Sequence, residues 1–229
     1  MQEISLHDVV FRFDEEKNQK ISNFNWFIEF FRTGQWENFT YQIFKQCAKK
    51  DKIALDIGAW IGPTSIWLSK NFKEVYSFEP DPVAFEALSK NLETSGCKNV
   101  LPIDKALYKE KTTLGFGLNP EFAHEGLGAS TSQLQANGSE ISVQTTTFRE
   151  LSRMIRFEDV SFVKVDIEGA EEHIVEDLFK YATTNKWDVL MEIHPNFMSS
   201  EGYENFKLTV LKYQPEEVEF GNQKFFRFS

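Results

Sequence analysis

The first residues whose spacing suggests chemistry are an acid and two glycines in the stretch Asp56-Ile-Gly58-Ala-Trp-Ile-Gly62, which follows the apolar run 52–57. Such a run predicts a strand, and open parallel sheets bind ligands at the carboxyl ends of their strands. Glycine lets a ligand approach the backbone closely. The spacing is not the Gly-x-Gly-x-x-Gly of dinucleotide-binding folds, and Asp56 would repel a pyrophosphate. A cationic ligand, such as a sulfonium with an amino-acid tail, suits Asp56 better; the alternative is an ordinary strand-to-helix turn.

Acids also follow the next two expected strands, 74–78 and 99–103. Glu79 stands 21 residues after Gly58, where a carboxylate can accept hydrogen bonds from both ribose hydroxyls of an adenosine ligand. NAD would be bound by the same acid, so Glu79 alone does not separate the cofactors. Asp104-Lys-Ala106 follows the third strand, where it would meet an adenine ring, although as a motif it has little specificity.

Four polar residues follow or end two later strands, 160–167 and 187–193: Asp166 and Glu168, then Glu192 and His194. Alternation along a strand places the members of each pair on one face, and Lys164 shares the face of Asp166. Histidine has the pKa suited to proton transfer near neutral pH. We interpret Asp166 as functional, whereas Glu168 is either functional or a carboxylate that stabilises the N-terminus of the following helix.

These groups lie on alternating strands and helices, with helices expected from Pro63, from Pro82 and over 170–181. The alternation predicts an α/β fold with a mostly parallel sheet covered on both faces. Gly221-Asn222 separates 217–220 from 224–228 and predicts a closing hairpin at the sheet edge. We expect one domain over 1–229, with an accessory cap over 1–50 and a cofactor-binding and catalytic core over 51–229.

Within the cap, the pattern predicts a strand over 4–13 that turns at 15–18, and a helix over 36–47. Between the third and fourth strands of the core lies an irregular insertion, 115–138, rich in Gly, Ser, Asn and Gln. Long loops in compact domains are often functional. We interpret the insertion as an active-site lid, with 126–132 ordering over a bound acceptor.

The composition of the chain restricts the classes of partner that it is expected to bind. The net charge is −10 and no basic cluster is present, which argues against a nucleic-acid partner. The two cysteines suggest neither a disulfide framework nor a metal site. The N-terminus does not resemble a signal peptide, and no apolar run approaches the ~20 residues that span a bilayer. The expectation is a cytoplasmic protein that does not insert into membranes.

Taken in order, Asp-Ile-Gly-Ala-x-Ile-Gly-Pro-Thr-Ser, Phe-Glu-Pro-Asp-Pro, Lys-Val-Asp-Ile-Glu-Gly-Ala-Glu and Glu-Ile-His-Pro resemble the FkbM-type methyltransferase family over roughly 51–195. The resemblance implies a class I methyltransferase fold, a Rossmann-like three-layer sandwich whose seven-stranded sheet has an antiparallel last strand. It also implies O-methylation of sugars, glycans or polyketide-type products. The cofactor would be S-adenosyl-L-methionine, leaving as S-adenosyl-L-homocysteine.

Carried over by position, the resemblance makes Asp56, Gly58 and Gly62 the cofactor turn, Glu79 the ribose clamp, and Asp104 with Ala106 the adenine site. The acceptor would be surrounded by Asp166, Glu168, Glu192 and His194. Trp60 departs from the asparagine common at its place in the family, which puts in doubt a side-chain hydrogen bond from this position to the cofactor.

Methyl transfer to a hydroxyl calls for a base, and the candidates are Asp166 and His194, with Glu168 and Glu192 orienting the acceptor or the base. A divalent cation held by Asp166 and its neighbours would do the same work by lowering the hydroxyl pKa, but the sequence shows no clear set of metal ligands.

Converging acids and many aromatics favour a hexose or deoxyhexose acceptor, such as rhamnose or fucose in a glycan or glycoconjugate, because carboxylates accept hydrogen bonds from sugar hydroxyls and aromatic rings cover the C–H faces. The alternatives are a polyketide-type acceptor, a nicotinamide-dependent oxidoreductase and a non-catalytic Rossmann-like binding module.

Overall fold

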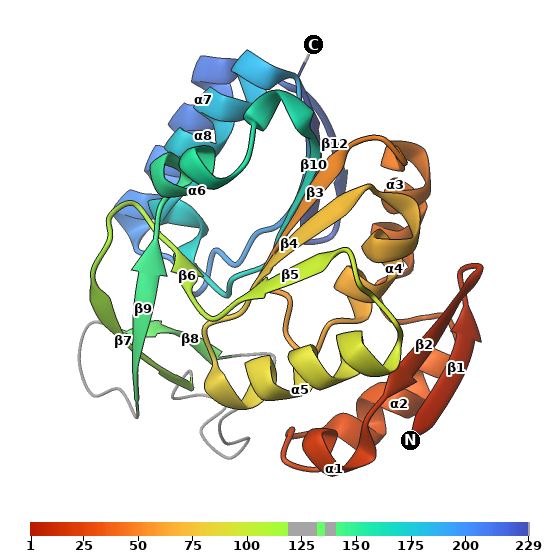
Figure 1. Ribbon diagram of the computed structural model, residues 1–229. Coiled ribbons are helices and arrows are strands. Elements are labelled where there is room, and N and C mark those ends of the chain that lie inside the picture. Colours follow the sequence, from red (N-terminus) through yellow and green to blue (C-terminus); the bar gives the residue numbers. More distant parts are fainter. Residues whose placement is uncertain (119–131, 136–140, 229) are drawn as a thin grey trace.

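The computed structural model describes residues 1–118, 132–135 and 141–228 (Figure 1). Its centre is a seven-stranded sheet in the order β12-β13-β11-β10-β3-β4-β5. In that order the strands are Glu216–Phe220, Gln223–Arg227, Asp188–Glu192, Val160–Val165, Ile53–Ile57, Glu74–Phe78 and Val100–Ile103. The five strands from β11 to β5 run parallel, whereas β13 pairs antiparallel with both β11 and β12. The predicted parallel sheet and its closing hairpin are confirmed.

Alternate side chains of the inner strands enter two separate hydrophobic cores, whereas the edge strand β12 is exposed. On β10, Phe162 packs into one core, while Val163 and Val165 pack into the other. The first core receives helices α4 (Pro63–Asn71) and α5 (Pro82–Thr94), both of which begin at the predicted prolines. The second receives α6 (Phe148–Met154), α7 (Val175–Asn185) and α8 (Ser200–Tyr213). Helices therefore cover both faces of the sheet, which is the expected three-layer sandwich (Figure 1).

The N-terminal residues form a hairpin and three helices that pack against α4 and α5. The hairpin joins β1 (Gln2–Leu6) to β2 (Val9–Phe13), and α1 (Glu15–Asn18), α2 (Phe24–Arg32) and α3 (Asn38–Cys47) follow. The single strand expected over 4–13 is wrong, because the chain reverses at His7 and Asp8, both in the left-handed region with φ of 51° and 64°. The helix expected over 36–47 is confirmed as α3.

The insertion expected to be irregular over 115–138 contains two strands. β7 (Thr113–Leu118) pairs antiparallel with β8 (Ser132–Gln135) and with β9 (Ile141–Thr146). With β6 (Ala106–Leu107) they form a sheet in the order β6-β9-β7-β8, which lies beside the carboxyl end of β5 in Figure 1. Except for Ser132, the lid expected over 126–132 lies outside the described residues.

Two further elements differ in detail from expectation. The helix expected over 170–181 is a 3₁₀ turn, η3 (Ala170–His173), followed by α7. Helix α8 was not predicted at all, although the Ser199 hydroxyl caps it by accepting from the N–H of Gly202. Among the described helices, none is long and apolar enough to cross a membrane.

Candidate active site

A cavity of about 590 Å³ opens at the carboxyl ends of β3, β4 and β10. Its walls come from the turns after these strands, from the segment Lys105–Leu107, and from the N-terminal helices. Phe116 of β7 and Leu134 of β8 also line it, so the small sheet contributes to the wall. This is the edge at which open α/β sheets bind ligands, and the volume suits a cofactor with a small acceptor.

The turn after β3 requires both of its glycines. Gly58 and Gly62 have φ of 83° and 94°, a region that side chains disfavour. A Cβ on Gly58 would lie 1.7 Å from the carbonyl oxygen of Asp166, and one on Gly62 would lie 2.7 Å from Cδ1 of Leu88. The turn is held from the other side, because the N–H groups of Gly58 and Ala59 both donate to the carbonyl of Phe78 at 3.0 Å. The backbone of this turn therefore borders the cavity without an intervening side chain.

Glu79 lines the cavity where the sequence predicts a ribose clamp. Its Oε2 accepts from the N–H of Trp60 and its Oε1 from the N–H of Asp81, both at 2.8 Å. Burial raises the pKa of this carboxyl to about 8. Trp60 has a left-handed backbone, φ 48°, and this conformation presents its N–H to Glu79. When the group is ionised, each of its oxygens keeps a lone pair for a ligand hydroxyl.

Two of the predicted cofactor residues lie outside the cavity. Asp56 is fully buried, and its Oδ2 accepts from the hydroxyls of Thr64 at 2.7 Å and Ser65 at 2.5 Å. It therefore anchors the start of α4 rather than facing a ligand. Asp104 is exposed beyond β5 and does not contribute to the cavity wall, whereas Ala106 is buried and does.

A buried lysine ties the glycine turn to the acids of β10. Nζ of Lys164 donates to the carbonyl of Gly58 at 2.9 Å and to Oδ2 of Asp166 at 3.3 Å, and lies 3.9 Å from Oδ1 of Asp56. Burial alone would lower the pKa of Lys164, but the surrounding carboxylates outweigh it and raise the pKa. Lys164 and Asp166, which the alternation along the strand places on one face, are thus in direct contact.

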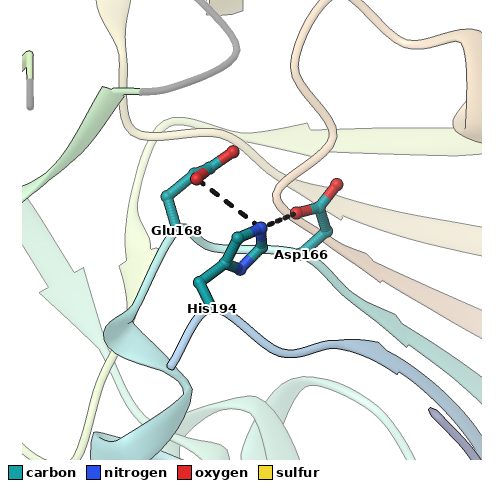
Figure 2. Close-up of side chains that lie close together, drawn as sticks. All are labelled: Asp166, Glu168 and His194. Carbon is teal, nitrogen blue, oxygen red and sulfur yellow. Dashed lines mark ion pairs between the residues drawn. The ribbon is translucent and has the colours of Figure 1, made fainter. Parts of the chain in front are cut away.

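The four predicted acceptor residues come together. Nε2 of His194 lies 3.6 Å from Oε2 of Glu168 and 3.8 Å from Oδ1 of Asp166 (Figure 2). It also lies 3.8 Å from Oε1 of Glu192. Asp166, Glu168 and Glu192 line the cavity, whereas His194 lies behind them. Glu168 reaches this place from a left-handed backbone, φ 52°, beyond the end of β10.

The charge on His194 is set by a residue that the sequence did not single out. Glu171 is fully buried, and its Oε1 lies 3.0 Å from Nδ1 of His194. Burial alone would lower the pKa of His194, but the bond to Glu171 and the charges of Glu168 and Asp166 raise it to about 10. Burial and the charge of Asp166 raise the pKa of Glu168 to about 8. At neutral pH His194 is therefore an imidazolium, which makes it a poor proton acceptor.

The same side chains have the composition of a metal site. Asp166, Glu168 and His194 each offer one ligand atom, and these atoms lie within 4.8 Å of one another. Carboxylates and imidazole suit zinc and related cations.

Sequence reasoning missed the residues that reach the cavity from α2 and from the connection between α2 and α3. Trp26, Phe27, Trp36 and Glu37 all line it. None belongs to a motif, and they meet the site only because α2 and α3 pack beside the glycine turn. Phe27 contacts the turn directly, since its ring meets that of Trp60 edge to face with centroids 4.9 Å apart.

A family model described as the methyltransferase FkbM domain matches residues 56–218. No curated protein matches the chain. Among solved structures, the methyltransferase FkbM from Methylobacillus flagellatus is 12% identical with a TM-score of 0.52; the match covers 93% of this chain but only 57% of that one. An rRNA methylase from Streptococcus thermophilus is 11% identical, with coverages of 83% and 95% and a TM-score of 0.47. TYW2 from M. jannaschii, in complex with AdoMet, is 14% identical, with coverages of 99% and 86% and a TM-score of 0.46. At such identities, structural likeness concerns the fold alone.

Proposed function

Because the chain belongs to the FkbM methyltransferase family, which uses S-adenosylmethionine, we propose that it methylates a hydroxyl group of a sugar. The observation that carries this proposal is the wall of three carboxylates, Asp166, Glu168 and Glu192, on the cavity that the glycine turn and Glu79 also line. A sugar ring presents several hydroxyl donors at once, and clustered carboxylates are matching acceptors.

The cavity fits the cofactor. Gly58 and Ala59 leave the backbone open to the methionine part, and the Glu79 carboxylate has free lone pairs for the ribose hydroxyls. Phe78, Ala106 and Leu107 supply apolar surface for adenine. When bound, S-adenosylmethionine supplies an electrophilic methyl group and leaves as S-adenosylhomocysteine.

We assign the role of general base to Asp166. As the acceptor oxygen attacks the methyl group, its proton passes to a carboxylate oxygen of Asp166, which borders the cavity. Lys164 holds the other oxygen of this carboxylate at 3.3 Å and thereby fixes its orientation. The His194 imidazolium stabilises the negative charge of this acidic cluster, and the carboxyl oxygens of Glu168 and Glu192 accept hydrogen bonds from further hydroxyls of the acceptor. This revises the expectation that His194 is an equal candidate for the base.

The test is to incubate the protein with labelled S-adenosylmethionine and separate panels of rhamnosides and fucosides, polyketide alcohols and RNA oligonucleotides. We expect label on a glycoside, at one hydroxyl position identified by NMR. Label confined to polyketide alcohols or RNA would overturn the sugar assignment, while label nowhere in the presence of tight S-adenosylhomocysteine binding would overturn all three acceptor classes.

A further inference from the structure

One wall of the cavity comes entirely from the N-terminal segment, outside the 56–218 match to the family model. It consists of Ser22, Asn23, Trp26, Phe27, Trp36 and Glu37. The carboxyl of Glu37 interacts electrostatically with Lys164, Asp166 and Glu192, which places it at the acid end of the cavity rather than beside Glu79. This wall therefore borders the space in which the acceptor must lie.

Glu37 has an unused acceptor atom. Its Oε2 is buried and has no hydrogen-bond partner among the described residues. A buried polar atom left without a partner costs roughly 1–3 kcal/mol, more for a charged group, so such atoms normally have a role. Burial raises the pKa of this carboxyl to about 8, although a hydrogen bond from Thr40 opposes the rise. A ligand hydroxyl would supply the missing donor.

Trp26 offers the matching apolar surface. Its ring is stacked on Phe30, with centroids 5.2 Å apart and planes 22° apart, yet the residue remains 61% exposed. Among the large apolar residues that are exposed in the described chain, it is the one that lines the cavity. An exposed indole face on a cavity that carboxylates also line can bind the C–H face of a sugar ring.

Several residues with an unfavourable backbone conformation line the same cavity. Of the eight described non-glycine residues with positive φ, four line the cavity: Asn23, Glu37, Trp60 and Glu168. Asn23 immediately precedes α2, which carries Trp26, and Glu37 immediately precedes α3. Such conformations cost about 1–3 kcal/mol each and persist where a site requires them. Here they set the positions of both α2 and the Glu37 carboxylate.

We propose that Trp26 and Glu37 form the acceptor subsite, in which the indole carries the C–H face of the sugar ring and the Glu37 carboxylate accepts a hydrogen bond from a hydroxyl of the same ring. This inference rests on the proposed function. It assigns the choice of acceptor to the N-terminal segment and leaves cofactor binding to the glycine turn and Glu79.

The test uses methyl α-rhamnoside and methyl α-fucoside as acceptors and S-adenosylhomocysteine as the cofactor probe. We expect Trp26→Ala to raise the acceptor KM about three- to tenfold, from the loss of an aromatic contact, and Trp26→Phe to stay within about twofold of wild type. Glu37→Gln should raise the acceptor KM about fivefold, from the loss of a charge-assisted hydrogen bond. The Kd for S-adenosylhomocysteine should change less than about twofold in every variant.

Two controls match these changes: Leu208→Ala removes an exposed apolar side chain on α8, and Glu29→Gln neutralises an exposed carboxylate on α2, both away from the cavity. Neither should alter the acceptor KM. If a glycoside is methylated and Trp26→Ala and Glu37→Gln keep the wild-type KM, or if they weaken S-adenosylhomocysteine as much as the acceptor, the subsite is overturned and the proposed function stands. If no glycoside is methylated by the wild type, both fall.

Discussion

Gly58 and Asp166 touch across the two central strands of the sheet: a Cβ on Gly58 would lie 1.7 Å from the carbonyl oxygen of Asp166. The glycine turn that borders the cavity and the segment that carries the proposed base are thus in backbone contact. Lys164 reinforces this contact by bonding both the carbonyl of Gly58 and the carboxylate of Asp166. A change in either segment must move the other.

We therefore expect Gly58→Ala to destabilise the protein by about 2–4 kcal/mol, since it adds a backbone clash to an unfavourable φ of 83°. Gly96→Ala is the matched control, because Gly96 also has a positive φ, 66°, but a Cβ there would meet nothing within 4 Å. It should cost only about 1 kcal/mol. Urea unfolding of both variants measures the difference, and equal losses would contradict the contact argument.

Glu79 is expected to hold the cofactor ribose. Glu79→Ala should weaken S-adenosylhomocysteine binding by about 1.5–3 kcal/mol, the range for hydrogen bonds to a charged group. Asp104→Ala removes the other strand-end acid predicted from the sequence, which is exposed outside the cavity, and should leave the affinity nearly unchanged. Calorimetry on both variants checks the pair. A greater loss in Asp104→Ala than in Glu79→Ala would reverse the assignment.

The raised pKa of the Glu79 carboxyl also predicts how the stability of the protein depends on pH. Burial raises the pKa of Glu79 from 4.5 to about 8 in the ligand-free protein. The folded state therefore holds a proton that the unfolded state releases, so this contribution is complete below about pH 4.5 and is lost as pH rises through 8. Glu37 and Glu168 act in the same direction, and His194 extends the loss towards pH 10.

We expect the unfolding free energy of the ligand-free protein to fall from pH 6 to pH 9, and about 1–3 kcal/mol of that fall to disappear in Glu79→Gln. Glu158→Gln, which changes a carboxylate that is 70% exposed, should keep the wild-type slope. Urea unfolding at several pH values gives the slopes. A wild type that becomes more stable towards pH 9 would contradict the argument.

The strands around the site could be predicted because each is a short apolar run that is bounded by a glycine, a proline or an acid. Ile57 stands directly before a glycine, Phe78 stands directly before an acid, and Glu192 is itself the acid. The fold of the first fifty residues could not. Helix α2 carries the helical spacing Phe24, Phe27, Ile28 and Phe31, but it begins at a left-handed Asn23 without a side-chain cap, so its start gives no local signal. The hairpin turn at His7-Asp8 likewise lacks the usual glycine.

The residues of the site likewise fall into those that the sequence could predict and those that it could not. Asp166, Glu168, Glu192 and His194 follow or end neighbouring parallel strands, so topology alone brings them together. Glu37 lies more than a hundred residues from them along the chain, and only tertiary packing places it there. The sequence could not show that Asp56 is buried beneath the glycine turn, where the hydroxyls of Thr64 and Ser65 both donate to its Oδ2.

Asp166→Asn should lower kcat about 10²–10⁴-fold, the usual contribution of a positioned base, while the Kd for S-adenosylhomocysteine stays within about threefold. The amide is isosteric but cannot take the proton. Asp159→Asn, a surface change near Arg156, should leave both values unchanged. Steady-state kinetics with the methylated glycoside supply the comparison. A wild-type kcat in Asp166→Asn would show that another group accepts the proton. The kcat of His194→Ala would then be measured next.

The cluster of acids around His194 is also expected to bind Zn²⁺. The ligand atoms of Asp166, Glu168 and His194 lie within 4.8 Å of one another, so Zn²⁺ should bind there and inhibit by occupying the base. Binding must displace the proton held on His194, whose pKa is about 10, so Zn²⁺ affinity should rise from pH 6 to pH 8. His194→Ala should lower the Zn²⁺ affinity measured by calorimetry at least about tenfold. His173→Ala, which removes the neighbouring histidine–carboxylate pair at 3.5 Å, should not. If methyl transfer instead stops after chelation and returns with Mg²⁺ or Zn²⁺, the cation activates the acceptor hydroxyl and Asp166 serves as its ligand rather than as the base.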